Sequence, residues 1–156
     1  MRVLVAAADG PGERARATLA DAGFVVERVE RLAEARVRAA TAPVAVVGPL
    51  ADAPATDLRD ALDAAGARTP LVGLDPDAAG YTTTVDGPAD DDLPVAVRLA
   101  RHTGAYRDAV DDLYERCRAA ADGDDPEVAE ALARADESLA DARRVAGRTP
   151  YDYLLD

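Results

Sequence analysis

Short, continuous apolar runs punctuate the first half of the chain. They are rich in Val, Leu and Ala, and they occupy Arg2–Ala8, Phe24–Val26, Pro43–Val47 and Pro70–Leu74. Runs of this kind are typical of strands that are covered on both faces of a parallel sheet. The chain is therefore expected to contribute at least four such strands.

Amphipathic segments separate these runs. Apolar residues recur there at helical spacing, which predicts three helices at about residues 13–22, 31–40 and 57–65. Thr56 or Asp57 is expected to cap the third helix. Strands that alternate with helices through short connections predict an α/β fold, a doubly wound parallel sheet with right-handed crossovers.

The fifth strand departs from this rhythm. Tyr81–Val85 has strand composition, but only residues 75–80 separate it from the strand before it. A parallel crossover usually takes about a dozen residues or more. The sequence therefore predicts a five-stranded sheet in which the fourth helix is short or missing.

A long amphipathic pattern begins after Pro94 and fills most of the remaining chain. Its apolar positions alternate spacings of three and four, at Val95, Leu99, His102, Tyr106, Val110, Leu113, Cys117 and Ala120. Gly123–Pro126 combines a chain break with a helix start. A second stripe follows at Val128, Leu132, Ala135, Leu139, Ala142 and Ala146.

Two helices that are joined by a tight turn and carry one apolar stripe each predict an antiparallel helical hairpin. We therefore expect an α/β domain at residues 1–103 and a helical tail at residues 104–156. The long helix is expected to run from the domain into the tail.

The chain is strongly acidic. Its 156 residues include 30 Asp and Glu against 18 basic residues, all of them Arg, and the formal net charge is −12. This resembles the composition of proteins from extreme halophiles, in which carboxylates keep a surface hydrated when salt screening is nearly complete. We interpret the acidity as solvation, and it argues against non-specific binding to nucleic acid.

Nothing in the sequence is typical of a membrane or secreted protein. No apolar run approaches the roughly 20 residues that span a bilayer, and the start of the chain does not have the pattern of a signal peptide. Cys117 is the single cysteine, so no internal disulfide can form. A cytoplasmic protein without a membrane segment is therefore expected.

The first part of the chain, Arg2–Thr103, resembles the receiver domain of response regulators. The resemblance rests on the strand and helix pattern, on Val3-Leu4-Val5, on Gly48-Pro49-Leu50 after the third strand, and on Gly87-Pro88 after the fifth. It implies a flavodoxin-like sheet with strand order 2-1-3-4-5. In receivers, two acids after the first strand and an Asp after the third bind Mg²⁺. That Asp accepts the phosphoryl group, and a Lys after the fifth strand contacts it.

The functional positions of receivers are not kept in this sequence. The acidic pair falls on Ala7 and Ala8, the acceptor Asp falls on Gly48, and the Lys falls on Gly87. Mg²⁺ needs several converging oxygen ligands, and a glycine cannot be phosphorylated. The resemblance therefore implies a degenerate pseudo-receiver without phosphotransfer, and neither a metal nor a cofactor is expected.

The tail, about Ala105–Asp156, resembles the HalX domain that follows receivers in haloarchaeal regulators. This resemblance rests on Tyr106-Arg107-Asp108, on Leu113-Tyr114 and on the aromatic, acidic end of the chain. The candidate interaction residues are concentrated here, namely Tyr106, Tyr114, Tyr151, Tyr153 and Leu154. Buried tyrosines often anchor interfaces, but these side chains are equally suited to filling the core of the hairpin.

Two further features lie at predicted strand ends. The loop Asp9–Gly12 precedes a helix, as phosphate-binding loops do, but Pro11 lacks an N–H and the acidic residues repel anions, so a plain turn is favoured. Asp9, Asp75 and Asp86 form a candidate weak cation or ligand site, because open sheets bind ligands at strand carboxyl ends. Chance proximity is the favoured interpretation in so acidic a chain.

His102 and Cys117 lie on the long amphipathic pattern and are interpreted as packing residues.

These features predict a non-enzymatic, phosphorylation-independent signalling or regulatory module. It would act through protein–protein contact, with the C-terminal helices mediating homodimerisation or docking of a protein partner. An alternative from another class is a small-ligand or nucleotide-binding protein that uses the strand carboxyl ends. A third is a transcription regulator with an arginine patch at Arg98, Arg101, Arg107, Arg116 and Arg118, ranked last because Asp and Glu are interleaved with these residues.

Overall fold

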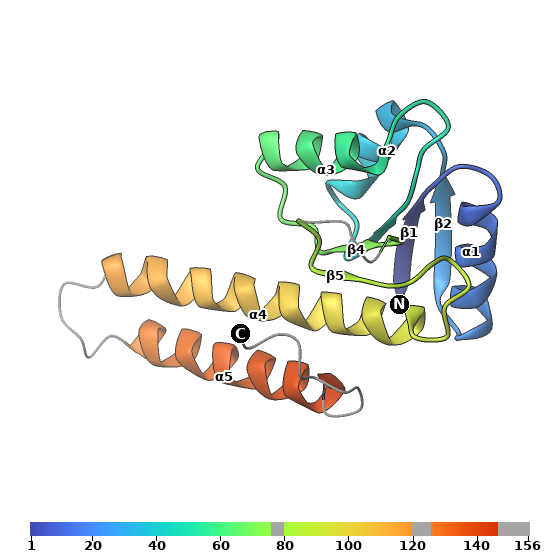
Figure 1. Ribbon diagram of the computed structural model, residues 1–156. Coiled ribbons are helices and arrows are strands. Elements are labelled where there is room, and N and C mark those ends of the chain that lie inside the picture. Colours follow the sequence, from blue (N-terminus) through green and yellow to red (C-terminus); the bar gives the residue numbers. More distant parts are fainter. Residues whose placement is uncertain (76–79, 120–125, 147–156) are drawn as a thin grey trace. The chain divides into compact units, whose positions relative to one another are not determined.

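The computed structural model describes residues 1–75, 80–119 and 126–146. The chain divides into two compact units, Met1–Arg101 and His102–Asp156. The first unit contains the sheet, and the second contains the C-terminal helices (Figure 1).

The first unit is built on one sheet of five parallel strands in the order β2-β1-β3-β4-β5 (Figure 1). The strands are β1 (Arg2–Ala6), β2 (Val25–Val29), β3 (Ala45–Val47), β4 (Leu71–Gly73) and β5 (Thr83–Thr84). The predicted doubly wound parallel sheet and its strand order are therefore confirmed.

Helices follow the strands as the apolar pattern predicts. They are α1 (Pro11–Asp21), α2 (Leu32–Ala39), α3 (Ala55–Ala64), α4 (Leu93–Ala119) and α5 (Pro126–Ala146). Between β4 and β5, the described residues (74–75 and 80–82) contain no helix. Residues 74–82 separate β4 from β5, which agrees with the short connection that the sequence predicted.

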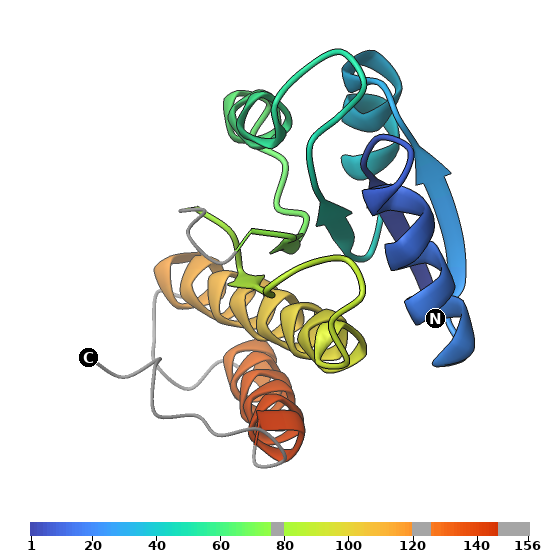
Figure 2. The same cartoon turned by 45° about the vertical axis from the view of Figure 1, so that its right-hand side comes forward.

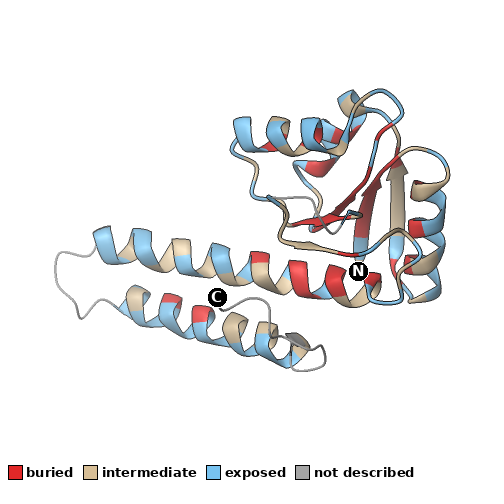
Figure 3. Ribbon diagram, in the orientation of Figure 1, coloured by how far each residue is buried: buried red, intermediate tan, exposed pale blue. Residues whose placement is uncertain are grey.

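Both faces of the sheet are covered, and the alternation along each strand sorts the core into two clusters. Val3, Val5 and Val46 pack with α1 and with the first turns of α4, while Leu4, Ala6 and Ala45 pack with α2 and α3. Side chains alternate between the two faces of a strand, so a continuous apolar run supplies both clusters. Figure 2 shows the helices on the two sides of the sheet, and Figure 3 shows the buried strands between them.

The stripe that α4 presents to the core differs from the predicted one. The first core cluster contains Leu93, Ala96, Val97 and Ala100. Of the two residues that began the predicted stripe, Leu99 is buried, whereas Val95 is only half-buried. The helix is apolar on nearly all sides over residues 93–100, so its period alone does not decide which side packs on the sheet. Further along, Gly104 is buried and lies inside an uninterrupted helix.

Other local expectations were also wrong. Pro54 occupies the N-cap of α3, and no side chain caps that helix, so Thr56 and Asp57 lie within its first turn. The fifth strand pairs with β4 through Thr83 and Thr84 alone. The hydroxyl of neighbouring Thr82 accepts a hydrogen bond from the Leu71 N–H, at 3.1 Å, and so supplements this short pairing.

The N-terminus of α2 offers a test of local capping. Arg31 occupies its N-cap with an extended backbone and makes no side-chain cap. An Arg31→Ser substitution would place a hydroxyl three residues before Glu34, which is the spacing of a capping box, and should raise the free energy of unfolding by about 1 kcal/mol. Urea unfolding in multimolar KCl would measure the change. Arg31→Ala is the matched control, and equal stability of the two variants would contradict the prediction.

In the second unit, α5 runs antiparallel to the later part of α4. Arg116 pairs with Glu127 at 3.1 Å, and Asp112, one turn earlier on α4, pairs with Arg134 at 3.2 Å. These two ion pairs define the register of the predicted antiparallel hairpin. No helix in the described part of the chain is long and apolar enough to cross a membrane.

Candidate functional site

The carboxyl ends of β1 and β3 bring together the positions at which a receiver would carry its acids. Ala7 follows β1 and is fully buried, and Gly48 follows β3 and is also buried. The Gly48 N–H donates to the Ala6 carbonyl at 3.0 Å, and the Ala8 N–H donates to the Pro49 carbonyl at 2.8 Å. These hydrogen bonds continue the pairing of the two strands beyond the sheet itself.

Apolar atoms fill the space beside Gly48. A Cβ at this glycine would lie 3.1 Å from Cδ1 of Leu74 and 3.2 Å from Cβ of Ala7. We call these three residues the apolar plug. Both contacts are tighter than ordinary van der Waals separation, so even a methyl group would have to displace its neighbours. A carboxylate at position 48 would therefore meet hydrocarbon rather than ligand oxygens.

The carboxylates near β1 surround an arginine. Arg28, on β2, donates to Asp9 at 2.9 Å, and its guanidinium lies 2.5 Å from Glu30 and 3.8 Å from Glu13. The hydrogen bond from Arg28 to Asp9 raises the pKa of Arg28, and the charges of Glu30 and Glu13 act in the same direction. The guanidinium thus supplies the positive charge at this end of the sheet.

The three aspartates of the candidate cation site do not form a metal-binding group. Asp9 is held by Arg28, Asp75 is exposed after β4, and the backbone N–H of Asp86 donates to Asp90 at 3.0 Å. Throughout the described residues, no group of three or more His, Cys, Asp or Glu side chains is placed to hold a metal ion. Gly87, the position of the receiver lysine, follows Asp86 in an open turn, where an added Cβ would meet no described atom within 4 Å.

A cavity of about 250 Å³ lies at the carboxyl ends of β3 and β4, and we call it the strand-end cavity. Its apolar wall includes Val47, Pro49, Pro54, Ala55 and Leu74, and its lining includes the aromatic residue Tyr81. The sequence named the strand carboxyl ends as a possible ligand site, and its candidate residue Asp75 lines this cavity. It did not point to Tyr81, which was interpreted only as the start of a strand.

Tyr81 is held against β4 by a close approach. A Cβ on Gly73 would lie 3.1 Å from two ring atoms of Tyr81, so the glycine lets the ring lie flat on the strand end. Burial raises the pKa of the Tyr81 hydroxyl, and the charge of Arg59 opposes that shift. The hydroxyl oxygen is buried and meets no hydrogen-bond partner among the residues that the structure describes.

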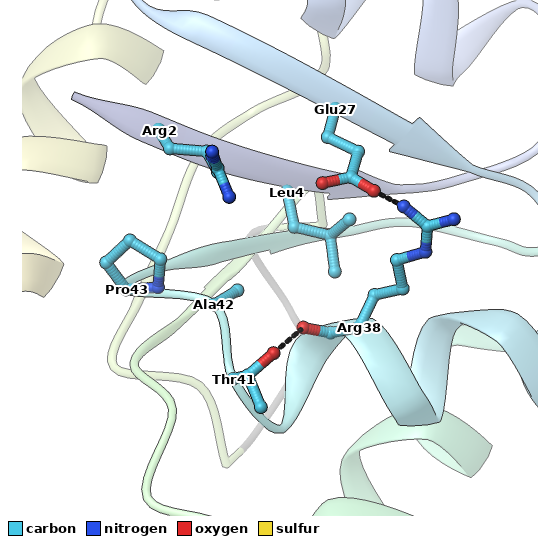
Figure 4. Close-up of a pocket in the computed structure, with 7 residues that line it drawn as sticks. All are labelled: Arg2, Leu4, Glu27, Arg38, Thr41, Ala42 and Pro43. Carbon is cyan, nitrogen blue, oxygen red and sulfur yellow. Dashed lines mark hydrogen bonds and ion pairs between the residues drawn. The ribbon is translucent and has the colours of Figure 1, made fainter.

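A second, smaller cavity lies at the opposite ends of the strands, between β1, β2 and the end of α2 (Figure 4). Its volume is about 120 Å³. Glu27 forms an ion pair with Arg38 across it, and the hydroxyl of Thr41 donates to the Arg38 carbonyl (Figure 4). Arg38 also pairs with Glu34 at 3.2 Å, so its charge is already compensated within the chain.

The hairpin carries a concentration of exposed apolar side chains. Among the described residues, the exposed large hydrophobic side chains are Val25, Val37, Val110, Tyr114 and Leu132, and the last three belong to the second unit. Tyr106 is half-buried, while Tyr151, Tyr153 and Leu154 lie outside the described residues. Of the candidate tyrosines that the structure describes, Tyr114 is therefore the exposed one.

Tyr114 on α4 and Leu132 on α5 each lie about half a helical turn from the ion pair that joins the two helices. Each lies two residues from a member of the Asp112–Arg134 ion pair, and two residues on a helix correspond to a rotation of about 200°. Both side chains therefore point away from that ion pair. Val110 lies one turn before Tyr114 on the same stripe. We call Val110, Tyr114 and Leu132 the apolar flank.

The predicted stripe of α5 was wrong in one respect that matters here. Leu132 was placed on the packed stripe, but it is 50% exposed. Ala135 of the same stripe is buried as predicted, and Ala131, which was not placed on it, is buried as well. Small residues allow backbones to approach closely, and this preference outweighs the area that Leu132 would bury. Spacing alone does not distinguish the alanine stripe from the adjacent leucine stripe.

Most arginines of the candidate patch already have partners in their own chain. Arg98 lies over the Phe24 ring at 5.3 Å, Arg101 donates to the Met1 sulfur at 3.2 Å, and Arg118 lies over the Tyr114 ring at 5.8 Å. Arg116 is paired with Asp112 and Glu127. His102 is half-buried, whereas Cys117 is exposed and does not fill the packed stripe on which it was placed.

Comparison with known proteins adds no relative: no protein-family model matches the chain, and neither does any curated protein.

Proposed function

We propose that this protein is a phosphorylation-independent signalling module that acts through protein–protein contact. The first part of the proposal is supported by the apolar plug, in which Leu74 and Ala7 occupy the space beside Gly48. Phosphoryl transfer through an aspartate needs a Mg²⁺ ion with converging oxygen ligands. Side chains of Ala, Gly and Leu offer none. The proposal also places the protein in the cytoplasm, without a metal or cofactor in this role.

The apolar flank is the observation that carries the contact function. Tyr114 is 62% exposed, Val110 36% and Leu132 50%. Tyrosine is among the residues that most often dominate binding energy at interfaces, because it buries a large area at a small entropic cost. Arg118 stacks on Tyr114 and so adds a cation to the edge of this surface.

A second copy of the chain is the partner that we propose for this surface. Two hairpins that meet through equivalent apolar flanks would form a four-helix arrangement with twofold symmetry. The net charge of −12 opposes self-association at low salt and is screened at high salt. Dimerisation is therefore expected to strengthen as the KCl concentration rises.

The double variant Tyr114→Ser/Leu132→Ser tests this contact. It should raise the dissociation constant of the dimer at least about tenfold, since each side chain lies in the apolar flank. Sedimentation equilibrium in multimolar KCl would measure it. Val37→Ser is the matched control, because Val37 is an exposed apolar residue of α2 in the other unit.

Two results would contradict the proposal. One is a wild-type chain that stays monomeric at every concentration and salt level. The other is a double variant whose self-association equals that of the Val37→Ser control.

A further inference from the structure

We infer that the strand-end cavity is a binding site for a compact, neutral and largely apolar small molecule. This inference is independent of the proposed contact function, because all residues of the cavity belong to the first unit and the apolar flank belongs to the second. Open α/β sheets bind their ligands at the carboxyl ends of the strands, and the cavity lies at that place.

The volume of the cavity fits a small ring system. At about 250 Å³ it exceeds the roughly 150 Å³ in which a dry apolar cavity is known to hold benzene. It is smaller than the sites that take a whole dinucleotide or a drug-sized ligand. A molecule of about ten non-hydrogen atoms is therefore the appropriate size.

The lining decides the polarity of the ligand. Val47, Pro49, Pro54 and Leu74 present hydrocarbon, Tyr81 presents an aromatic ring, and no arginine is among the described residues of the lining. The single charged side chain among those residues is the Asp75 carboxylate, which repels anions. A phosphate or carboxylate would lose its hydration here without gaining a cation, so a nucleotide is disfavoured and a neutral molecule is favoured.

Two strand-end glycines shape this site. Gly48 lets Leu74 lie across the end of β3, and Gly73 lets the Tyr81 ring lie on the end of β4. The same substitution that closes the receiver's acceptor position therefore supplies an apolar wall to the neighbouring cavity. Where a receiver has a polar phosphorylation site, this inference places an apolar ligand site.

Binding of 4-fluoroacetophenone, followed by fluorine and amide NMR on the full chain, tests the inference. We expect saturable binding with a dissociation constant of about 1 mM or tighter. The amide shifts should be largest at Val47, Gly48 and Leu74. The anion 4-fluorobenzoate should bind at least about tenfold more weakly, because its charge would lose hydration against the apolar wall and be repelled by the Asp75 carboxylate.

An Ala55→Phe substitution is designed to fill the cavity from its rim. It should weaken binding of 4-fluoroacetophenone at least about tenfold. The matched control is Ala51→Phe, because Ala51 is exposed in the loop that precedes α3 and is absent from the cavity lining. The control should bind as tightly as the wild-type chain.

The inference is overturned if the wild-type chain gives no saturable shifts, or if the shifts lie away from the carboxyl ends of β3 and β4. It is also overturned if a folded Ala55→Phe variant binds as well as the control, or if 4-fluorobenzoate binds as tightly as the ketone. Should Ala55→Phe not fold, the position of the wild-type shifts and the comparison of the two compounds still decide. Loss of this binding would leave the dimerisation measurements unaffected, so the two proposals fail separately.

Discussion

A Gly48→Asp variant, which introduces an aspartate where a receiver carries its acceptor, should lose at least about 3 kcal/mol of unfolding free energy. It should also stay unlabelled by acetyl phosphate in the presence of Mg²⁺. The new carboxylate would start from a Cβ that already crowds Leu74 and Ala7. It would then have to remain charged among apolar groups or take up a proton, and either outcome favours the unfolded chain.

Two companion variants separate crowding from charge. Gly48→Ala introduces the crowding alone and should cost about 1–2 kcal/mol. Adding Leu74→Ala to it should recover part of that cost, with a coupling energy of about 1 kcal/mol between the two positions. Urea unfolding measures all of these stabilities. A Gly48→Asp protein that is as stable as the wild type, or that accepts a phosphoryl group, would rule out the apolar plug.

Gly12→Ala should destabilise the protein by about 2–3 kcal/mol, although an alanine normally stabilises a helix relative to glycine. A Cβ on Gly12 would lie 2.6 Å from the carbonyl oxygen of Ala7, which is a backbone atom. That backbone cannot easily retreat. The Ala7 N–H is bonded to the Val29 carbonyl at 3.1 Å, and the Gly12 N–H is bonded to the Ala8 carbonyl at 2.9 Å.

Gly23→Ala is the matched control for this substitution. Its added Cβ would meet no atom within 4 Å, but the backbone has a φ of +85°, so the cost is local strain of about 1 kcal/mol. Thermal and urea unfolding would rank the two variants. If Gly12→Ala were as stable as the wild type, α1 could not approach the end of β1 as closely as the structure places it.

The fold was largely readable from the sequence because the buried strands are short and unambiguous. A segment such as Val44–Val47 is short, rich in Val and apolar on both sides, which is the composition of a strand that is covered on both faces. Alternation of strands and helices then leaves few topologies, and the strand order followed from the resemblance. The faces of α4 and α5 were not readable, because Leu93, Val95 and Leu99, or Ala131 and Leu132, satisfy similar spacings. Which of these faces is buried is decided by packing against neighbouring elements.

The candidate site, too, could be predicted from the sequence only in part. The sequence shows that Ala7, Ala8 and Gly48 stand where a receiver carries its acids, once the strands are aligned with a receiver. What fills the space is not visible, because Leu74 reaches Gly48 across paired strands and Arg28 reaches Asp9 from a strand 19 residues further along. Distances of this kind depend on strand register, which an apolar run does not encode residue by residue.

The two outer strands of the sheet bear on how copies of this protein meet. An unpaired strand edge is a template for adding a further strand from another molecule, which leads to fibrils. Here β2 carries Glu27 and Arg28 in its centre, and β5 is only two residues long. The charges on β2 and the short length of β5 both disfavour pairing with a strand from another molecule. At high protein concentration we therefore expect association through helices to be reversible, with no conversion into β-rich aggregates.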